Sequence, residues 1–264
     1  MTTNMESRVN ILGVGVSAIS LDEAVDRTKT LLSGDAQGYV CVTGVHGIME
    51  AQTDSEFRRI LNRSFLTTPD GMPTVWLGKA NGFKGMTRVY GPDYMIAVCG
   101  RFVEQGCRHF LYGGKPSVAE ELRAELIRRF PGIQIVGTYT PPFRPLNQQE
   151  EDELRTQLTD SRADILWCGL STPKQERFMA SYQGRLPVQL MVGVGAAFDL
   201  LSGNLSEAPD WMKNSGLQWA YRLIKEPRRL WRRYLGNNPR FAWLTFLQFS
   251  KLRTFTLSTD AFDK

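Results

Sequence analysis

The sequence predicts an α/β protein with a mostly parallel sheet flanked by helices, followed by a basic amphipathic helical appendage. Short apolar, β-branched runs alternate with longer amphipathic stretches, a pattern typical of strands joined by crossover helices. Near-continuous apolar runs such as residues 163–170 indicate strands buried on both faces. Because the composition changes near residues 203–212, we expect an α/β domain over residues 1–210 and the appendage over residues 211–264.

Six apolar runs are expected to form strands and four amphipathic stretches to form helices. The strands are predicted over residues 8–16, 38–45, 107–114, 133–140, 163–170 and 188–195. The helices are predicted over residues 20–34, 55–64, 117–130 and 147–161. Ser20 and Glu23 have the spacing of a capping box at the first helix. Ligands of such sheets bind where strand carboxyl ends meet the following loops, so these loops hold the candidate site residues.

Basic charge is concentrated in the appendage. The formal net charge is +5, and residues 211–253 hold ten lysines or arginines against one acidic residue, Glu226. An anionic partner is therefore expected at this end: phosphate, nucleic acid or a lipid surface. In a helix after Pro227, basic and apolar side chains would occupy opposite faces: Arg228, Arg229, Arg232 and Arg233 against Leu230, Trp231, Tyr234 and Leu235. Such a helix could lie on an anionic bilayer, or pack on the body with a solvated basic face.

The cysteines and histidines favour neither a disulfide framework nor a zinc site. The four cysteines lack CxxC spacing, and only two histidines accompany them: Cys41, Cys99, Cys107, Cys168, His46 and His109. We expect buried, reduced thiols and a reducing cytosol. The N-terminal residues contain no apolar leader, and no window reaches the roughly 18 apolar residues of a spanning helix. Membrane contact is therefore expected to be peripheral, from the cytosolic side.

Residues 13–17, GVGVS, match a dinucleotide-binding fingerprint only in part. The third glycine is missing at the required spacing, and no acidic residue closes a second strand. An ordinary turn is the better interpretation, which disfavours a nucleotide-linked oxidoreductase.

The middle of the chain offers a carboxylate and groups suited to phosphate. In TTPDGMP, Asp70 either occupies a turn or lies at a strand's carboxyl end, where it could act as a general base. Arg88 in RVYGPD offers a guanidinium fork for a phosphate. Gly113 and Gly114 precede a helix start, whose free N–H groups suit an anion such as pyrophosphate.

Two further strand ends carry polar or glycine residues. Lys174 and Gln175 place a cation and an amide after a buried strand, although a solvated helix start fits equally well. Gly193 and Gly195 let a ligand approach the backbone, and Asp199 could accept from ribose hydroxyls. No Asp-x-Asp metal signature occurs, so arginine is the expected partner of phosphate.

Seven segments, in order along the chain, closely resemble the WecG/TagA/CpsF family of bacterial glycosyltransferases. They are TTPDGMPTVWLG, RVYGPDYM, FLYGGKP, STPKQERF, GVGAAFDLLSG, APDWMKNSGLQWAYRL and EPRRLWRRYL, within a match over residues 8–236. The resemblance implies a Rossmann-like enzyme that transfers a sugar from a UDP-sugar, with inversion, to a polyprenyl-diphosphate-linked acceptor at the inner membrane face. It places the reaction in exopolysaccharide or teichoic-acid-like polysaccharide synthesis, requires no metal or other cofactor, and includes self-association of the family's members.

The same resemblance implies roles for individual residues. Asp70 would be the general base that deprotonates the acceptor hydroxyl. Thr43 and Gln175 would line the sugar pocket, and Arg88 would contact the donor or its leaving group. Three appendage arginines would complete the site over the diphosphate: Arg222, Arg229 and Arg232.

One departure from the family concerns the donor sugar. Many members have an asparagine two residues after the threonine, where this chain has Val45, followed by His46. If that asparagine reads the sugar, the donor here differs from N-acetylmannosamine and His46 substitutes in recognition. A neutral structural histidine is the alternative, so glucose, N-acetylmannosamine and its uronic acid all stay open as donors.

Two other classes compete with an enzyme. A basic, aromatic tail also suits single-stranded nucleic acid, and salt-sensitive binding without affinity for UDP would favour that class. A non-catalytic scaffold on the membrane surface would tolerate loss of the Asp70 carboxylate. We expect a glycosyltransferase with no nucleic-acid partner.

Overall fold

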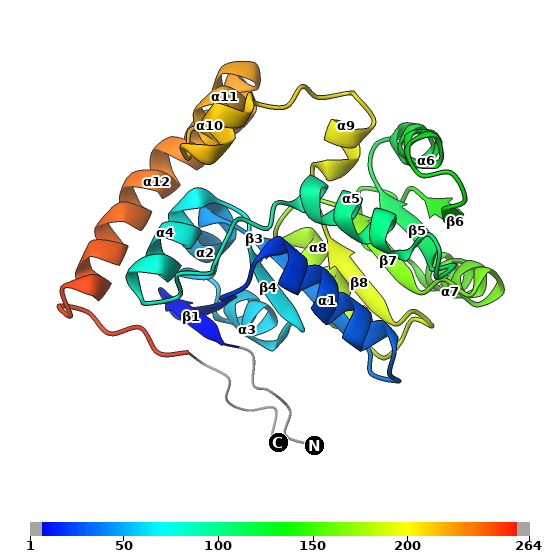
Figure 1. Ribbon diagram of the computed structural model, residues 1–264, viewed down its shortest axis with the longest axis horizontal. Helices are drawn as coiled ribbons and strands as arrows, with labels where there is room; N and C mark the ends of the chain where they lie inside the picture. Colours follow the sequence, from blue (N-terminus) through cyan, green and yellow to red (C-terminus); the bar gives the residue numbers. More distant parts are fainter. Residues whose placement is uncertain (1–6, 258–264) are drawn as a thin grey trace. The chain divides into compact units, whose positions relative to one another are not determined.

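The computed structural model describes residues 7–257 and contains a hairpin and a six-stranded sheet in the order β4-β3-β8-β7-β5-β6 (Figure 1). The hairpin strands are β1 (Arg8–Ile11) and β2 (Val14–Ser17); the sheet strands are β3 (Gly38–Thr43), β4 (Leu66–Pro69), β5 (Arg108–Gly113), β6 (Gln134–Tyr139), β7 (Ile165–Gly169) and β8 (Leu190–Gly193). The helices are α1 (Leu21–Leu32), α2 (Val45–Glu50), α3 (Ser55–Arg63), α4 (Met72–Ala80), α5 (Gly91–Phe102), α6 (Val118–Arg129), α7 (Gln148–Ser161), α8 (Lys174–Tyr182), α9 (Ala197–Leu201), α10 (Asp210–Asn214), α11 (Gln218–Lys225) and α12 (Pro227–Phe249).

The contacts within the chain define two compact units. Unit 1 contains the residues up to Ser20, Thr43–Tyr90 and the residues from Glu207 onward. Unit 2 contains Leu21–Val42 and Gly91–Ser206. The basic tail therefore belongs to the same compact unit as Thr43 and β4. The boundary predicted at residue 210 separates a part of the chain that is expected to have its own function. This division by function stays a prediction.

Unit 2 confirms the predicted parallel sheet. Strand β8 pairs in parallel with β3 and β7, and β5 pairs in parallel with β7 and β6. Helix α5 contacts both α1 and α9, and α9 in turn contacts α6. Helix α8 is joined to α7 by a hydrogen bond, which the Tyr182 hydroxyl donates to Glu151. The first four residues of β7 are buried, which explains the continuous apolar run in its sequence.

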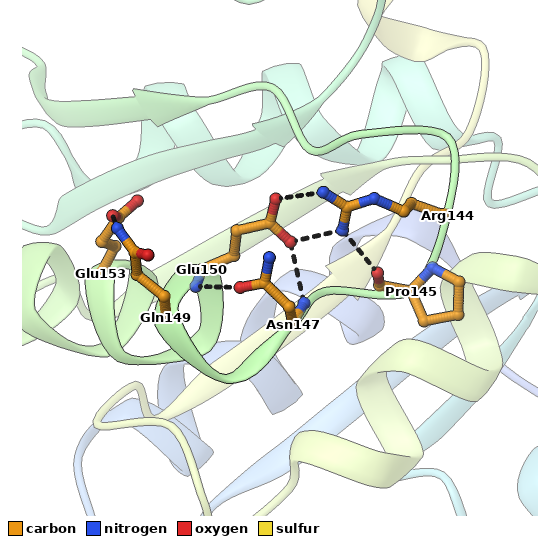
Figure 2. A network of polar contacts seen from close by, with 6 residues as sticks. All are labelled: Arg144, Pro145, Asn147, Gln149, Glu150 and Glu153. Atoms are coloured by element: carbon orange, nitrogen blue, oxygen red, sulfur yellow. Dashed lines mark hydrogen bonds and ion pairs between the residues drawn. The ribbon is translucent and has the colours of Figure 1, made fainter.

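The predicted helix at residues 147–161 begins at a capping box. The Asn147 side chain accepts from the Glu150 backbone N–H at 2.9 Å, and the Glu150 carboxylate accepts from the Asn147 N–H at 2.8 Å. Arg144 donates to both carboxylate oxygens of Glu150 at 2.7 Å (Figure 2). These reciprocal bonds satisfy donors that have no partner within α7, so the helix starts where the sequence indicates.

The predicted strand over residues 8–16 is instead a hairpin. Leu12 and Gly13 have φ angles of 54° and 84°, in the left-handed region, so the chain reverses there. Strand β1 then pairs antiparallel with β2. Asn10 supports the reversal, since its Oδ1 accepts from the Gly13 N–H at 2.9 Å. The apolar residues between and after them, Ile11, Leu12 and Val14, concealed the reversal in the sequence. GVGVS therefore forms the end of this turn and β2, in line with its interpretation as a turn.

The predicted faces of α12 are wrong in part. Leu230, Phe241 and Leu244 face the interior of unit 1, with exposed fractions of 2%, 6% and 7%. Trp231 and Leu235, expected on the same apolar face as Leu230, are 48% and 60% exposed. The inward stripe follows spacings of three and four residues over the full length of the helix, and this turns Trp231 and Leu235 outward.

The tail is fastened to the rest of unit 1 at two places remote from each other in sequence. Gln248 near the end of α12 accepts from the Leu12 N–H at 3.0 Å and donates to the Asn10 carbonyl at 2.9 Å. Before α11, Gly216 has a φ of 74°, and a Cβ there would lie 2.6 Å from the Trp76 ring. Only glycine fits this turn, so α11 begins in close contact with α4.

The cysteine prediction is confirmed, because all four cysteines are free and buried: Cys41, Cys99, Cys107 and Cys168. Over residues 7–257, none of the helices is long and apolar enough to cross a bilayer.

A buried histidine in the core of unit 2 makes the free energy of unfolding depend on pH. His109 in β5 is fully buried, and its Nδ1 accepts a hydrogen bond from Trp167 Nε1 at 3.1 Å. Its Nε2 is buried and has no hydrogen-bond partner among the described residues. Burial lowers the pKa of His109 from 6.5 to about 4, although the charge of Asp164 acts in the opposite direction.

We predict that His109→Gln flattens the acid limb of the stability curve. Between pH 6.5 and 4 the unfolded chain protonates this histidine while the folded chain does not, so the free energy of unfolding falls as pH falls through this window. The contribution is about 3 kcal/mol over the window. Urea titrations of both proteins at several pH values measure it; parallel curves would contradict the assignment.

Candidate functional site

The ends of β3 and β4 bring Asp70 and Thr43 together in unit 1. The Asp70 N–H donates to the Thr43 carbonyl at 3.1 Å. A Cβ added to Gly44 would lie 3.5 Å from Asp70 Oδ2, so the carboxylate lies directly over the turn that follows β3. Of the two interpretations of TTPDGMP, the strand end is therefore correct. We call Asp70 and the side chains around it, described below, the Asp70 cluster.

Arg88 joins this cluster through the segment that precedes α5. The Val89 N–H donates to the Pro69 carbonyl at 2.8 Å, which holds the segment against β4. The Arg88 guanidinium lies 4.7 Å from the centre of the Tyr90 ring and donates to Gln218 Oε1 of α11 at 3.1 Å. Burial raises the pKa of the Tyr90 phenol well above its usual value, and the negative charge of Asp70 raises it further. The phenol therefore stays protonated.

The tail contributes arginines of two kinds. Arg222 is half-buried and lies 3.8 Å from Glu226, whereas Arg229 is more exposed and pairs with the same carboxylate at 2.6 Å. Arg232 is exposed and lies over the Trp231 ring, with its guanidinium carbon 5.2 Å from the ring centre.

Arg233, rather than Arg232, turns toward the Asp70 cluster. Its Nε is buried and has no hydrogen-bond partner within residues 7–257. Burial lowers the pKa of Arg233, as do the charges of Arg222 and Arg229, while Tyr234 and Asp70 act in the opposite direction. This residue was not among those predicted to bind substrate, because adjacent arginines in RR cannot be told apart without the position of the helix.

His46 has a partner on the tail. Its Nδ1 lies 3.2 Å from Asn237 Nδ2 of α12, and both side chains are half-buried. His46 is the second residue of α2 and follows Thr43 by three residues, so this contact joins the tail to the segment that adjoins Asp70.

Unit 2 contains a second cluster, at the start of α8, built around the buried pair Gln175 and Glu176. They are 3% and 1% exposed. Gln175 Oε1 accepts from the Gly195 N–H at 3.0 Å, and Gln175 Nε2 donates to Glu176 Oε1 at 3.0 Å. The Thr172 hydroxyl donates to the same oxygen at 2.8 Å. Glu176 was missed by the sequence analysis, although STPKQERF contains it, since a charged residue at a helix start is usually solvated.

The predicted glycines of unit 2 are explained by close packing. A Cβ on Gly193 would lie 3.0 Å from the Gln175 amide and 2.8 Å from the Met179 methyl group. Gly113 has a φ of 123°, and a Cβ there would lie 2.7 Å from the backbone of Gly169. Gly114, with a φ of 78°, donates its N–H to the Gly169 carbonyl at 3.1 Å. These contacts explain why glycine occupies each of the three positions. Ligand binding at these glycines stays a prediction.

Two further predicted residues belong to unit 2. Lys174, the first residue of α8, is exposed. Asp199 is half-buried on the short helix α9. Their roles also stay predictions.

The Asp70 cluster has the chemistry of a general base beside an anion site. Asp70 offers a carboxylate at a strand end, and three guanidinium groups of unit 1 adjoin it or its neighbours: Arg88, Arg222 and Arg233. Among residues 7–257, no three His, Cys, Asp or Glu side chains gather so as to hold a metal ion. Arg88, Arg222 and Arg233 contribute positive charge around Asp70 and Tyr90.

Comparison with known proteins identifies relatives over most of the chain. The model of the glycosyl transferase WecG/TagA/CpsF family matches residues 9–254. The chain is 29% identical over 202 residues, 76% of each protein, to N-acetylglucosaminyldiphosphoundecaprenol N-acetyl-beta-D-mannosaminyltransferase of Bacillus subtilis (strain 168). It is 31% identical over 217 residues, 82% of each protein, to the protein of the same name from Bacillus spizizenii (strain ATCC 23059 / NRRL B-14472 / W23).

We predict that Arg233→Met leaves the free energy of unfolding unchanged or raises it by about 1 kcal/mol, because a buried guanidinium with an unsatisfied Nε is costly to desolvate. Urea unfolding of the two proteins measures the difference. The matched substitution Arg8→Met should be destabilising, since Arg8 donates to the Ser64 carbonyl at 2.6 Å. A loss of 2 kcal/mol or more at Arg233, about the cost of a broken buried hydrogen bond, would make Arg233 a structural residue instead.

Proposed function

Since this chain belongs to the WecG/TagA/CpsF family of glycosyltransferases, we propose that it transfers a sugar from a UDP-sugar, with inversion, to a polyprenyl-diphosphate-linked acceptor. The observation that carries the proposal is the position of Asp70, at the end of β4 beside Thr43 and near the Arg233 guanidinium. The names of both Bacillus relatives describe a lipid-diphosphate acceptor and so support this class of acceptor.

Asp70 is the proposed general base. Its carboxylate takes the proton of the acceptor hydroxyl while the hydroxyl oxygen forms a bond to the anomeric carbon of the donor sugar. The bond between that carbon and the UDP oxygen breaks, and UDP leaves with the electron pair. Attack from the face opposite the leaving group inverts the anomeric configuration.

Arginines take the place of a metal ion in this proposal. The departing diphosphate gains negative charge, and guanidinium groups stabilise it by charge-assisted hydrogen bonds. Arg88, Arg222 and Arg233 are the proposed groups, together with the predicted Arg229 and Arg232. The buried Nε of Arg233 is a donor that a phosphate oxygen would satisfy.

The donor is best sought among N-acetylmannosamine, its uronic acid and glucose. The relatives' names support N-acetylmannosamine. Val45 stands where many members carry the asparagine of a Thr-x-Asn pattern, and His46 follows it, so a different sugar stays open as the donor. The roles of Gln175 and the other predicted residues of unit 2 in donor binding are part of the same proposal.

Peripheral binding to the inner face of the membrane is the proposed role of the outer face of α12. Exposed aromatic and aliphatic side chains occur along it with exposed arginines: Trp231, Leu235, Trp243, Phe246 and Phe249 with Arg228, Arg232 and Arg240. Aromatic rings suit the interfacial region of a bilayer, and the arginines suit anionic lipid. A lipid-linked acceptor would then be presented to an enzyme already at the surface.

We predict that Asp70→Asn lowers kcat by about 10²- to 10⁴-fold and leaves UDP affinity nearly unchanged, because only proton removal is lost. UDP release with a short-chain polyprenyl-diphosphate sugar acceptor and UDP calorimetry measure the two quantities. Asp54→Asn is the matched control, since Asp54 caps α3 by accepting from the Phe57 N–H at 2.9 Å and asparagine caps equally well. Normal turnover by Asp70→Asn would remove Asp70 from the role of base.

We predict that the double substitution Arg228→Glu/Arg240→Glu lowers binding to anionic phospholipid vesicles by tenfold or more, since each basic residue near the surface contributes on the order of 1 kcal/mol. Turnover of a water-soluble acceptor should be retained. Lys79→Glu/Arg155→Glu, with the same change of charge at exposed positions outside α12, is the control. Equal loss of vesicle binding in both variants would mean that net charge, rather than α12, drives the association.

A further inference from the structure

Gln218, the first residue of α11, connects two side chains of the Asp70 cluster. Its Oε1 accepts from Arg88 Nη1 at 3.1 Å, and its side chain also forms a hydrogen bond with the Tyr90 phenol. Since Oε1 faces Arg88, the amide nitrogen is the group that donates to the phenol. A carboxamide is suited to this position because it offers an acceptor at one atom and a donor at the next.

The contact with Gln218 adds to the restraints on the Arg88 side chain. Arg88 lies on irregular backbone, whose neighbouring Thr87 and Val89 N–H groups donate to the carbonyls of Ile19 and Pro69. A long guanidinium side chain loses much rotamer freedom when it binds a ligand. Ordering it in advance lowers that cost and raises affinity.

The start of α11 is itself rigidly placed. The turn at Gly216 admits no side chain, because a Cβ there would lie 2.6 Å from the Trp76 ring and 3.4 Å from Met72 Cβ. Gln218 follows two residues later and is half-buried. The amide is therefore delivered to Arg88 by packing between α11 and α4.

We infer that Gln218 is a positioning residue, which holds the Arg88 guanidinium in the orientation that binds the diphosphate of the donor. The inference rests on the proposed function, because it takes UDP as the ligand of Arg88. It gives α11 a role separate from that of the tail arginines. A correctly seated α11 orders a side chain of the α/β body.

The test is a double-mutant cycle on UDP affinity, measured by calorimetry. Gln218→Ala should weaken UDP binding by about tenfold, the effect expected for a hydrogen bond to a charged group. In the Arg88→Ala background the same substitution should have no further effect, because its target is gone. A merely structural role would weaken binding equally in both backgrounds.

Gln248→Ala is the matched control, since Gln248 also fastens the tail by two amide hydrogen bonds, to Leu12 and Asn10, away from Arg88. It should leave UDP affinity unchanged in both backgrounds. Wild-type affinity in Gln218→Ala, equal losses with and without Arg88, or an Arg88→Ala variant that binds UDP normally would each overturn the inference alone. A wild-type protein that does not bind UDP would overturn the proposed function and the inference with it.

Discussion

The seating of α11 and α12 beside the ends of β3 and β4 is the constraint on which the rest of unit 1 depends. It places a guanidinium with a buried Nε, that of Arg233, near the Asp70 carboxylate. Desolvating one such ion costs several kcal/mol, even after relaxation. Leu230, Phe241 and Leu244 offset this cost, because each buried side chain stabilises by about 1.5–3 kcal/mol. Packing of the tail therefore holds the positive charge of Arg233 at a place where an anionic ligand would bind.

Neighbouring residues of α12 lie in different surroundings, some in the interior of unit 1 and others in solvent. Arg232 and Arg233 are neighbours in sequence, yet Arg232 lies over Trp231 at the surface and Arg233 turns toward the strand ends. The inward side chains carry the proposed chemistry, and the outward aromatic and basic side chains carry the proposed contact with lipid. An enzyme that acts on a lipid-linked acceptor would gain from this arrangement, because the proposed membrane-binding surface and the proposed catalytic cluster belong to one compact unit.

The sequence was sufficient where local pattern decides the structure. Apolar runs predicted the parallel strands of unit 2, and the amphipathic stretch over residues 147–161 predicted α7. It was insufficient where tertiary packing decides. The reversal at Leu12 and Gly13 lies among apolar residues, and the inward position of Arg233 depends on the rotation of α12. Glu176 is a buried carboxylate to which Gln175 and Thr172 donate, and neither contact can be read from the sequence.

The most direct measurement is a donor screen on the purified protein with a short-chain polyprenyl-diphosphate sugar acceptor in EDTA. UDP-N-acetylmannosamine, its uronic acid and UDP-glucose are compared for UDP release, and the lipid product is identified by its mass and anomeric configuration. We expect one donor to give a product extended by a single sugar of inverted configuration, with no requirement for a divalent metal. A product that retains the donor configuration, or turnover that EDTA abolishes, would contradict the mechanism in which Asp70 and arginines suffice.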